Sequence, residues 1–102
     1  MNLKRVVVTG LGSLTPIGKT ISQYWNSLIN GVSGADLITR FDTLLHRTKF
    51  ACEIKNYNPD DFFDKKESRR LDLYAQYGII AADEAITDSG LDLEKTDKDK
   101  VG

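Results

Sequence analysis

VVVTGLGSLTPIG, residues 6–18, joins three consecutive valines to a loop with glycines at positions 10, 12 and 18. A short continuous apolar run is typical of a strand buried on both faces in an α/β sheet, so residues 4–9 are predicted to form the first strand. Glycine directly after such a strand indicates that the backbone approaches another group closely. That group is either a dinucleotide phosphate or another part of the same protein.

The glycine pattern matches the Gly-x-Gly-x-x-Gly fingerprint of dinucleotide-binding domains only in part. Thr15 takes the third glycine position, Pro16 follows it, and a helix is not expected before Thr20. The fingerprint needs a helix at that turn, because its amide groups bind the pyrophosphate. The acidic ribose ligand would have to be Asp36 or Asp42, and neither follows a recognisable second strand. Close packing of backbone segments is therefore favoured, and a dinucleotide site is the alternative.

A first helix and a second strand are expected after this loop. Thr20 and Gln23 have the spacing of a capping box, and Gly31 can end the helix that they begin. No periodicity holds from residue 33 to residue 49. A weak strand is expected over residues 50–55, where apolar and polar side chains alternate.

A long helix is expected over residues 65–89, because Asp64 can cap it in a second capping-box pattern and Gly90 can end it. Within it, LYAQYGIIAA at residues 73–82 is apolar nearly all round, with Gln76 as the only plainly polar side chain. Such a helix is typical of the interior of a large protein, because a surface helix needs a polar face.

The rest of the chain offers this helix few packing partners. Residues 92–100, DLEKTDKDK, have the composition of a solvated linker, and Val101-Gly102 resembles the opening of another strand. We therefore expect residues 1–102 to be the front part of a longer α/β domain that is incomplete in this chain.

Composition excludes several classes of function. A net charge of −1 over 102 residues does not favour binding to nucleic acid or to an acidic membrane surface. The N-terminal apolar run is too short for a signal peptide, and no stretch approaches the ~20 apolar residues of a membrane span. A single cysteine excludes an internal disulfide and suits a reducing compartment, so a cytoplasmic location is expected.

Cys52 and His46 are the residues that most invite a catalytic interpretation, because thiolates and imidazoles serve many enzymes. Cys52 lies in FACEI, inside the expected second strand, with no helix N-terminus beside it to lower the pKa of its thiol. A buried and inert thiol is therefore the favoured interpretation. His46 has no second histidine or carboxylate at ligand spacing, so neither a metal nor a cofactor site is expected.

A basic cluster gives the clearest functional signal. Lys66, Arg69 and Arg70 have i, i+3, i+4 spacing and so share one helix face. In the first turns of a long helix these cations would oppose the helix dipole, which suggests a use elsewhere. An acidic protein partner fits better than nucleic acid, because no aromatic stacking platform accompanies the cluster. The alternative is a solvated face partly neutralised by nearby carboxylates, namely Asp64, Glu67 and Asp72.

Three stretches together resemble one enzyme family, and they cover the chain in order and almost completely. They are KRVVVTGLGSLTPIG at residues 4–18, WNSLINGVSGADLITRFDT at 25–43 and KESRRLDLYAQYGIIAADEAITDSGL at 66–91. The sequence is similar to the start of the elongating β-ketoacyl-acyl carrier protein synthases, specifically the synthase II type. A polyketide-type relative stays open as an alternative source.

The resemblance implies a thiolase-like fold, in which two similar α/β halves with mixed sheets are covered by helices. Residues 1–102 would be a truncated portion of the N-terminal domain of a cytoplasmic homodimer that needs no cofactor. The family moves an acyl chain from acyl carrier protein to a cysteine. It then decarboxylates malonyl-acyl carrier protein to a carbanion that attacks the thioester, with support from two histidines.

The resemblance carries over no catalytic residue to this chain. The family's nucleophile and both histidines belong beyond Gly102, and neither Cys52 nor His46 matches their motifs. The basic positions that are thought to hold the acidic carrier protein match Lys66, Arg69 and Arg70. We therefore expect this chain to be inactive alone and to contribute to carrier-protein docking. The alternatives are a non-catalytic docking module and, less favoured, a dinucleotide-binding domain.

Overall fold

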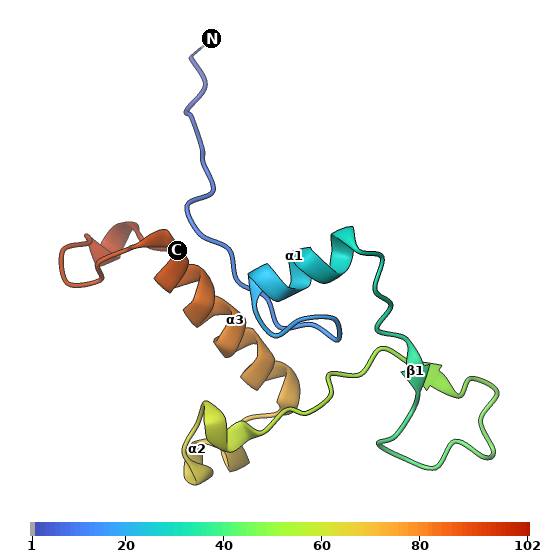
Figure 1. Cartoon of the computed structure of the whole chain (residues 1–102). Helices are drawn as coiled ribbons and strands as arrows, with labels where there is room; N and C mark the ends of the chain where they lie inside the picture. Colours follow the sequence, from blue (N-terminus) through green and yellow to red (C-terminus); the bar gives the residue numbers. More distant parts are fainter. Residues whose placement is uncertain (1) are drawn as a thin grey trace.

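The computed structural model describes residues 2–102 of the chain. Its elements follow an extended N-terminal segment and are, in order, α1 (Ile21–Ile29), β1 (Asp36–Leu37), β2 (Phe50–Ala51), the 3-10 turn η1 (Pro59–Asp61), α2 (Lys65–Arg70), α3 (Leu73–Ser89) and the 3-10 turn η2 (Lys98–Lys100) (Figure 1). The arrangement is open, with extents of 56 × 38 × 25 Å. Among the described residues, no hydrophobic side chain is fully buried.

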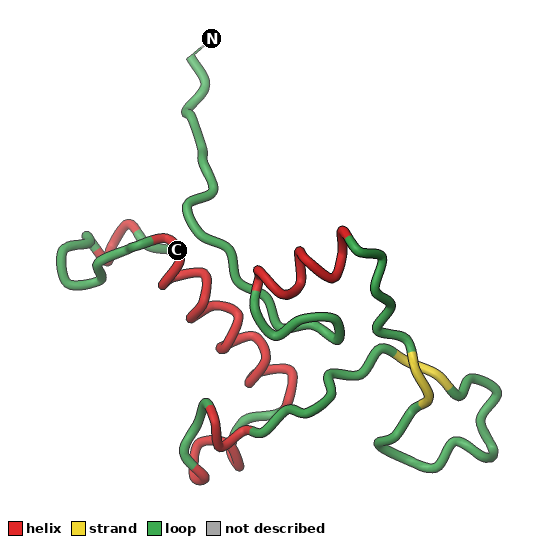
Figure 2. The backbone as a smooth tube through the Cα atoms, viewed as in Figure 1, coloured by secondary structure: helices red, strands yellow, loops and turns green. Residues whose placement is uncertain are grey.

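The sheet in the described part of the chain consists of one short antiparallel pair. Asp36 lies opposite Ala51 and Leu37 opposite Phe50, at the crossing of the two strands in Figure 2. The expected strand over residues 50–55 is therefore present only at its start. Its partner β1 lies in the stretch where no periodicity predicted an element.

The prediction of a strand over residues 4–9 is wrong for this structure. The segment is extended but pairs with no other strand of the described chain, and it leads away from the helices (Figures 1 and 2). Val6 is 90% exposed. A strand is defined by hydrogen bonds to a neighbour, and residues 2–102 place no neighbour beside these valines. The short antiparallel pair β1–β2 is consistent with part of the expected fold, which was predicted to be incomplete in this chain.

Helix α1 begins and ends as its sequence predicts. The Thr20 hydroxyl accepts the backbone N–H of Gln23 at 3.2 Å, and the Gln23 side chain accepts the N–H of Lys19 at 3.0 Å. Gly31 adopts a left-handed φ of 66° directly after the C-cap. The local capping chemistry of this helix is thus confirmed.

The long helix predicted over residues 65–89 is two helices, α2 and α3. The Asp64 cap is confirmed, because its carboxylate accepts the N–H of Glu67 at 2.7 Å, and Gly90 ends α3 with a φ of 69°. Between the helices Leu71 turns to an extended conformation, with φ −104° and ψ 130°. The chain therefore changes direction where a continuous helix was expected.

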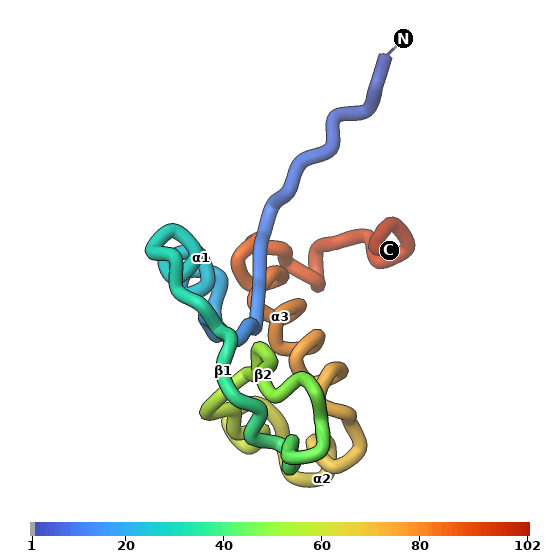
Figure 3. Tube along the Cα trace, turned by 90° about the vertical axis from the view of Figure 1, so that its right-hand side faces the viewer, coloured from blue at the N-terminus to red at the C-terminus, as the bar shows by residue number. Residues whose placement is uncertain are grey.

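Two of the three glycines of the opening stretch, Gly10 and Gly12, face the backbone of α3. A Cβ atom on Gly10 would lie 2.2 Å from the carbonyl oxygen of Ala85, and one on Gly12 would lie 2.0 Å from that of Ala81. These distances exclude any side chain at either position. The N-terminal segment reaches α3 here and then turns towards α1 (Figure 3). Close packing of backbone segments is thereby confirmed.

Two carboxylates of α3 hold the same segment by hydrogen bonds. Asp88 accepts the backbone N–H of Leu11 at 2.9 Å, and Glu84 accepts that of Ser13 at 3.0 Å. Because these residues lie one helical turn apart, one face of α3 fixes two alternate amides of the extended chain.

The C-terminal residues form a turn rather than a strand. The Asp97 carboxylate accepts the N–H of Asp99 at 3.2 Å and caps η2, whereas Val101 and Gly102 belong to no strand. The expected strand opening at these two residues is therefore wrong for this structure. No helix in residues 2–102 has the length and apolar character that a membrane crossing requires.

Candidate functional site

The basic patch, defined as Lys66, Arg69 and Arg70, lies on α2, and all three residues are exposed. The i, i+3, i+4 spacing holds because all three belong to one helix. None of them takes part in an ion pair within residues 2–102, where the paired cations are Arg40, Lys55, Lys95 and Lys100. The patch therefore presents three cations to solvent.

The structure overturns the argument that these cations oppose the helix dipole. Because α2 ends at Arg70, Arg69 and Arg70 occupy its last turn, where positive charge is favourable. The suggestion that the cluster breaks a local rule is therefore wrong for Arg69 and Arg70, whereas Lys66 still lies in the first turn of α2. The position of the cluster on the surface and its lack of partners remain as the reasons to regard it as a binding surface.

The nearby carboxylates are engaged elsewhere or unpaired. Asp64 caps α2 through the N–H of Glu67. Asp72, the N-cap of α3, makes no capping hydrogen bond with its side chain. Within the described chain, neither forms an ion pair with the basic patch. Glu67 also forms no ion pair there. The alternative of a solvated face, partly neutralised by the nearby carboxylates without direct ion pairs, therefore stays open.

One side chain ties the patch-bearing helix to the rest of the chain. Gln76 donates from its side-chain nitrogen to the carbonyls of Ser68 and Leu71, both at 3.0 Å. Its oxygen accepts the hydroxyl of Tyr57 at 2.6 Å. Sequence analysis identified Gln76 as the lone polar residue of an apolar stretch, but no pattern indicated these partners.

Tyr57 is itself held by two aromatic rings. Its ring stacks on Phe62 with centroids 6.0 Å apart and meets Tyr77 edge to face at 5.0 Å. Burial, and to a smaller degree the charge interaction with Tyr77, raises the pKa of Tyr57. The hydroxyl is therefore protonated over the physiological range and donates to Gln76.

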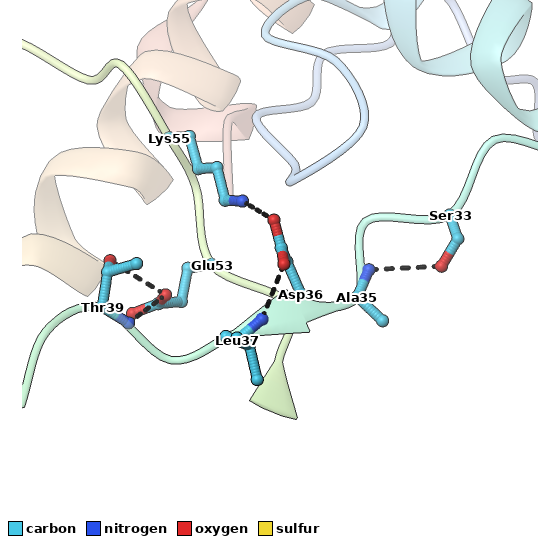
Figure 4. A network of polar contacts seen from close by, with 7 residues as sticks. All are labelled: Ser33, Ala35, Asp36, Leu37, Thr39, Glu53 and Lys55. Carbon is cyan, nitrogen blue, oxygen red and sulfur yellow. Dashed lines mark hydrogen bonds and ion pairs between the residues drawn. The ribbon is translucent and has the colours of Figure 1, made fainter. Parts of the chain in front are cut away.

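A second polar network fixes the β1–β2 pair, as Figure 4 shows. Lys55 donates to the carboxylate of Asp36, and this hydrogen bond is the main reason that the pKa of Asp36 is lowered. Glu53 accepts the N–H of Thr39 at 2.9 Å, and this bond chiefly lowers the pKa of the Glu53 carboxyl. These contacts hold the two strands and their loops together.

Cys52 and His46 do not form a catalytic pair. Cys52 is exposed, so the expectation of a buried thiol is wrong. The reason is that β2 ends at Ala51 and no layer of the described chain covers the next residue. His46 lies edge to face on Phe41 with centroids 5.3 Å apart. Within residues 2–102, no three ligating side chains gather as a metal site would require.

The family described as "Beta-ketoacyl synthase, N-terminal domain" matches residues 3–102 of the chain. The 3-oxoacyl-[acyl-carrier-protein] synthase 2 of Staphylococcus aureus (strain COL) is 46% identical over 99 residues, which are 97% of this chain and 24% of that protein. The synthase of the same name from Synechocystis sp. (strain ATCC 27184 / PCC 6803 / Kazusa) is 40% identical over 99 residues, again 24% of its length. The chain thus spans 24% of the length of these curated relatives.

Solved structures agree with these sequence matches. The ishigamide ketosynthase/chain length factor superposes with a TM-score of 0.69 at 34% identity, covering 86% of this chain and 22% of that chain. A second structure is named "AntDE:AntF (apo): type II PKS acyl-carrier protein in complex with its ketosynthase bound to the hexaketide". It superposes with a TM-score of 0.66 at 22% identity and covers 89% of this chain and 23% of that chain. The described helices and strand pair are therefore arranged as part of a ketosynthase fold. This chain belongs to the β-ketoacyl synthase family and matches its N-terminal domain.

Proposed function

We propose that this chain is the N-terminal part of a β-ketoacyl-acyl carrier protein synthase of fatty-acid elongation. The observation that carries the proposal is the family match over residues 3–102, together with 46% identity to a relative named for this activity. In this proposal residues 1–102 are a truncated portion of the N-terminal domain of a thiolase-like fold. The intact synthase acts as a cytoplasmic homodimer, and the exposed valines of residues 4–9 pair with strands that this sequence does not contain.

The reaction is a decarboxylative condensation. A cysteine takes the acyl group from acyl carrier protein, malonyl-acyl carrier protein loses CO2, and the resulting carbanion attacks the thioester carbon and releases the thiolate. No residue of this chain is assigned a chemical step. Its role is to build the scaffold and to bind the carrier protein.

We infer that the basic patch is the surface on which acyl carrier protein docks. Its three cations share a helix face, are exposed and have no ion-pair partner among the described residues. One structural neighbour is described as a ketosynthase in complex with an acyl-carrier protein. Complementary charge chiefly steers encounter and fixes register, so the patch acts on carrier-linked substrates alone.

Charge reversal in the intact synthase tests this docking role. Arg69→Glu with Arg70→Glu raises KM for acyl-acyl carrier protein and reduces its dependence on salt, while thioesters without the protein part react as before. Lys98→Glu with Lys100→Glu is the matched control, since it reverses two exposed charges beyond the opposite end of α3. Unchanged carrier-protein kinetics in the arginine variant would refute the assignment.

The two alternative functions are less well supported by the geometry. A free docking module would need a core of its own, and no hydrophobic side chain is fully buried within residues 2–102. A dinucleotide-binding loop would need open space at its glycines, yet the backbone of α3 occupies the space beside Gly10 and Gly12.

A further inference from the structure

Gln76 is the only buried residue of the described chain, with 3% of its surface exposed. Its neighbours on α3 are apolar and yet exposed, as Leu73 at 42% and Tyr74 at 78% illustrate. The hydrophobic effect would produce the reverse order. Within this chain, the buried position of the amide coincides with three hydrogen bonds, which satisfy both of its polar atoms.

The amide uses both of its polar atoms on groups outside its own helix. Its nitrogen donates to the carbonyl of Ser68 within α2 and to that of Leu71 at the C-cap of α2. The last carbonyls of a helix have no partner inside that helix, so a side-chain donor is required where they are buried. Gln76 thereby ends α2 and fixes where α2 lies against α3.

Three contacts determine which way the amide points. Backbone carbonyls only accept hydrogen bonds, so the nitrogen of Gln76 has to face Ser68 and Leu71. The oxygen then faces Tyr57, whose hydroxyl donates at 2.6 Å from between the rings of Phe62 and Tyr77. The side chain of Gln76 therefore links three segments: the loop before η1, α2 and α3.

Helix α2 depends on such an anchor because it is short. Six residues are too few to form a stable helix in water without tertiary contacts. We propose that Gln76 is a positioning residue, which holds α2 so that the basic patch meets the carrier protein in register. This inference rests on the proposed docking function and adds to it the element that orients the docking surface.

Gln76→Glu in the intact synthase tests the inference. The carboxylate keeps the shape and an acceptor for Tyr57 but removes both donors to the α2 carbonyls. KM for acyl-acyl carrier protein rises about fivefold, whereas kcat and KM for a thioester without the protein part stay as in the wild type. Amide hydrogen exchange accelerates in α2 and not in α1.

Two further variants keep the test decisive. Gln23→Glu is the matched control, since this exposed glutamine contributes only to the cap of α1, and it leaves both substrates unaffected. Tyr57→Phe keeps the ring and removes one hydrogen bond to Gln76, so it gives a smaller rise in KM for acyl-acyl carrier protein. This variant replaces Gln76→Glu in the test if Gln76→Glu does not fold. An unchanged KM in Tyr57→Phe would then overturn the inference.

The outcomes separate this inference from the docking proposal. If Arg69→Glu with Arg70→Glu raises the carrier-protein KM but Gln76→Glu does not, docking stands and the role of Gln76 is overturned. If Gln76→Glu raised KM equally for a thioester without the protein part, the role of Gln76 would also be overturned, because Gln76 would then support folding in general. If the arginine variant has no effect, docking itself fails and the inference fails with it.

Discussion

The carboxylate of Glu84 in α3 accepts the backbone N–H of Ile21, the first residue of α1, at 2.8 Å. The same oxygen accepts the N–H of Ser13 at 3.0 Å. The first amides of a helix have no partner within it, so Glu84 supplies from α3 an acceptor that α1 lacks. One carboxylate of α3 therefore holds both the start of α1 and the glycine-rich loop of residues 10–18.

Glu84→Leu leaves the amides of Ser13 and Ile21 without an acceptor. Because each part-buried unsatisfied donor costs about 1–3 kcal/mol, exchange of both amides accelerates and the protein unfolds at lower denaturant concentration. Glu84→Gln keeps an acceptor oxygen and has a smaller effect. Amide hydrogen exchange measures both, and unchanged protection of Ile21 in Glu84→Leu would show that this contact does not hold α1.

Gly12→Ala forces a methyl group to within 2.0 Å of the carbonyl oxygen of Ala81. Helix α3 and the N-terminal segment must move apart, which lowers the free energy of unfolding by about 1–3 kcal/mol. Ser13→Ala is the neighbouring control, since it keeps the backbone bond to Glu84 and removes a buried hydroxyl that has no partner in the described chain. Denaturant titration of both variants measures the difference, and equal midpoints would contradict this packing.

The raised pKa of Tyr57 predicts a loss of stability at alkaline pH. The folded state holds the phenolic proton more tightly than the unfolded state, so the contribution is complete below the ordinary pKa of 10.0 and is lost as pH rises through the raised value. Tyrosinate absorbance should show one tyrosine ionising last, and Tyr57→Phe should remove that step. A difference spectrum with no delayed step would contradict the burial of this hydroxyl.

The lowered pKa of Asp36 predicts that the β1–β2 pair loses stability at acidic pH. Its contribution is complete above the ordinary pKa of 3.8 and is lost as pH falls through the lowered value. Lys55→Met removes the hydrogen bond and the charge that are named as causes, so the Asp36 pKa moves back towards 3.8. An NMR titration of the Asp36 carboxyl measures the shift, and an unchanged pKa in Lys55→Met would contradict the ion pair.

The caps could be predicted from sequence because they depend on a few adjacent residues. Thr20 and Asp64 begin helices and Gly31 and Gly90 end them as expected. The glycine packing was also predicted, since a glycine-rich loop after an apolar run indicates close approach whatever the partner. The basic patch was recognised from its helical spacing and from the family resemblance, and its docking role stays a prediction.

The errors concern contacts between different segments of the chain, which no pattern within one segment reveals. Residues 4–9 form no strand, because strand pairing depends on a neighbour that the described chain does not place there. At the break between α2 and α3, Gln76 donates hydrogen bonds to Ser68 and Leu71, which no local propensity reveals. The exposure of Cys52 has the same origin, since burial of a thiol requires a covering layer.

Condensation assayed with acyl- and malonyl-acyl carrier protein tests the central claim most directly. The account predicts that the intact synthase containing this sequence forms the β-ketoacyl product with release of CO2. It also predicts that the 102-residue chain alone forms none, because no residue of the chain is assigned a chemical step. Product formed by the chain alone, or an intact protein that binds both carrier-linked substrates without condensing them, would contradict the account.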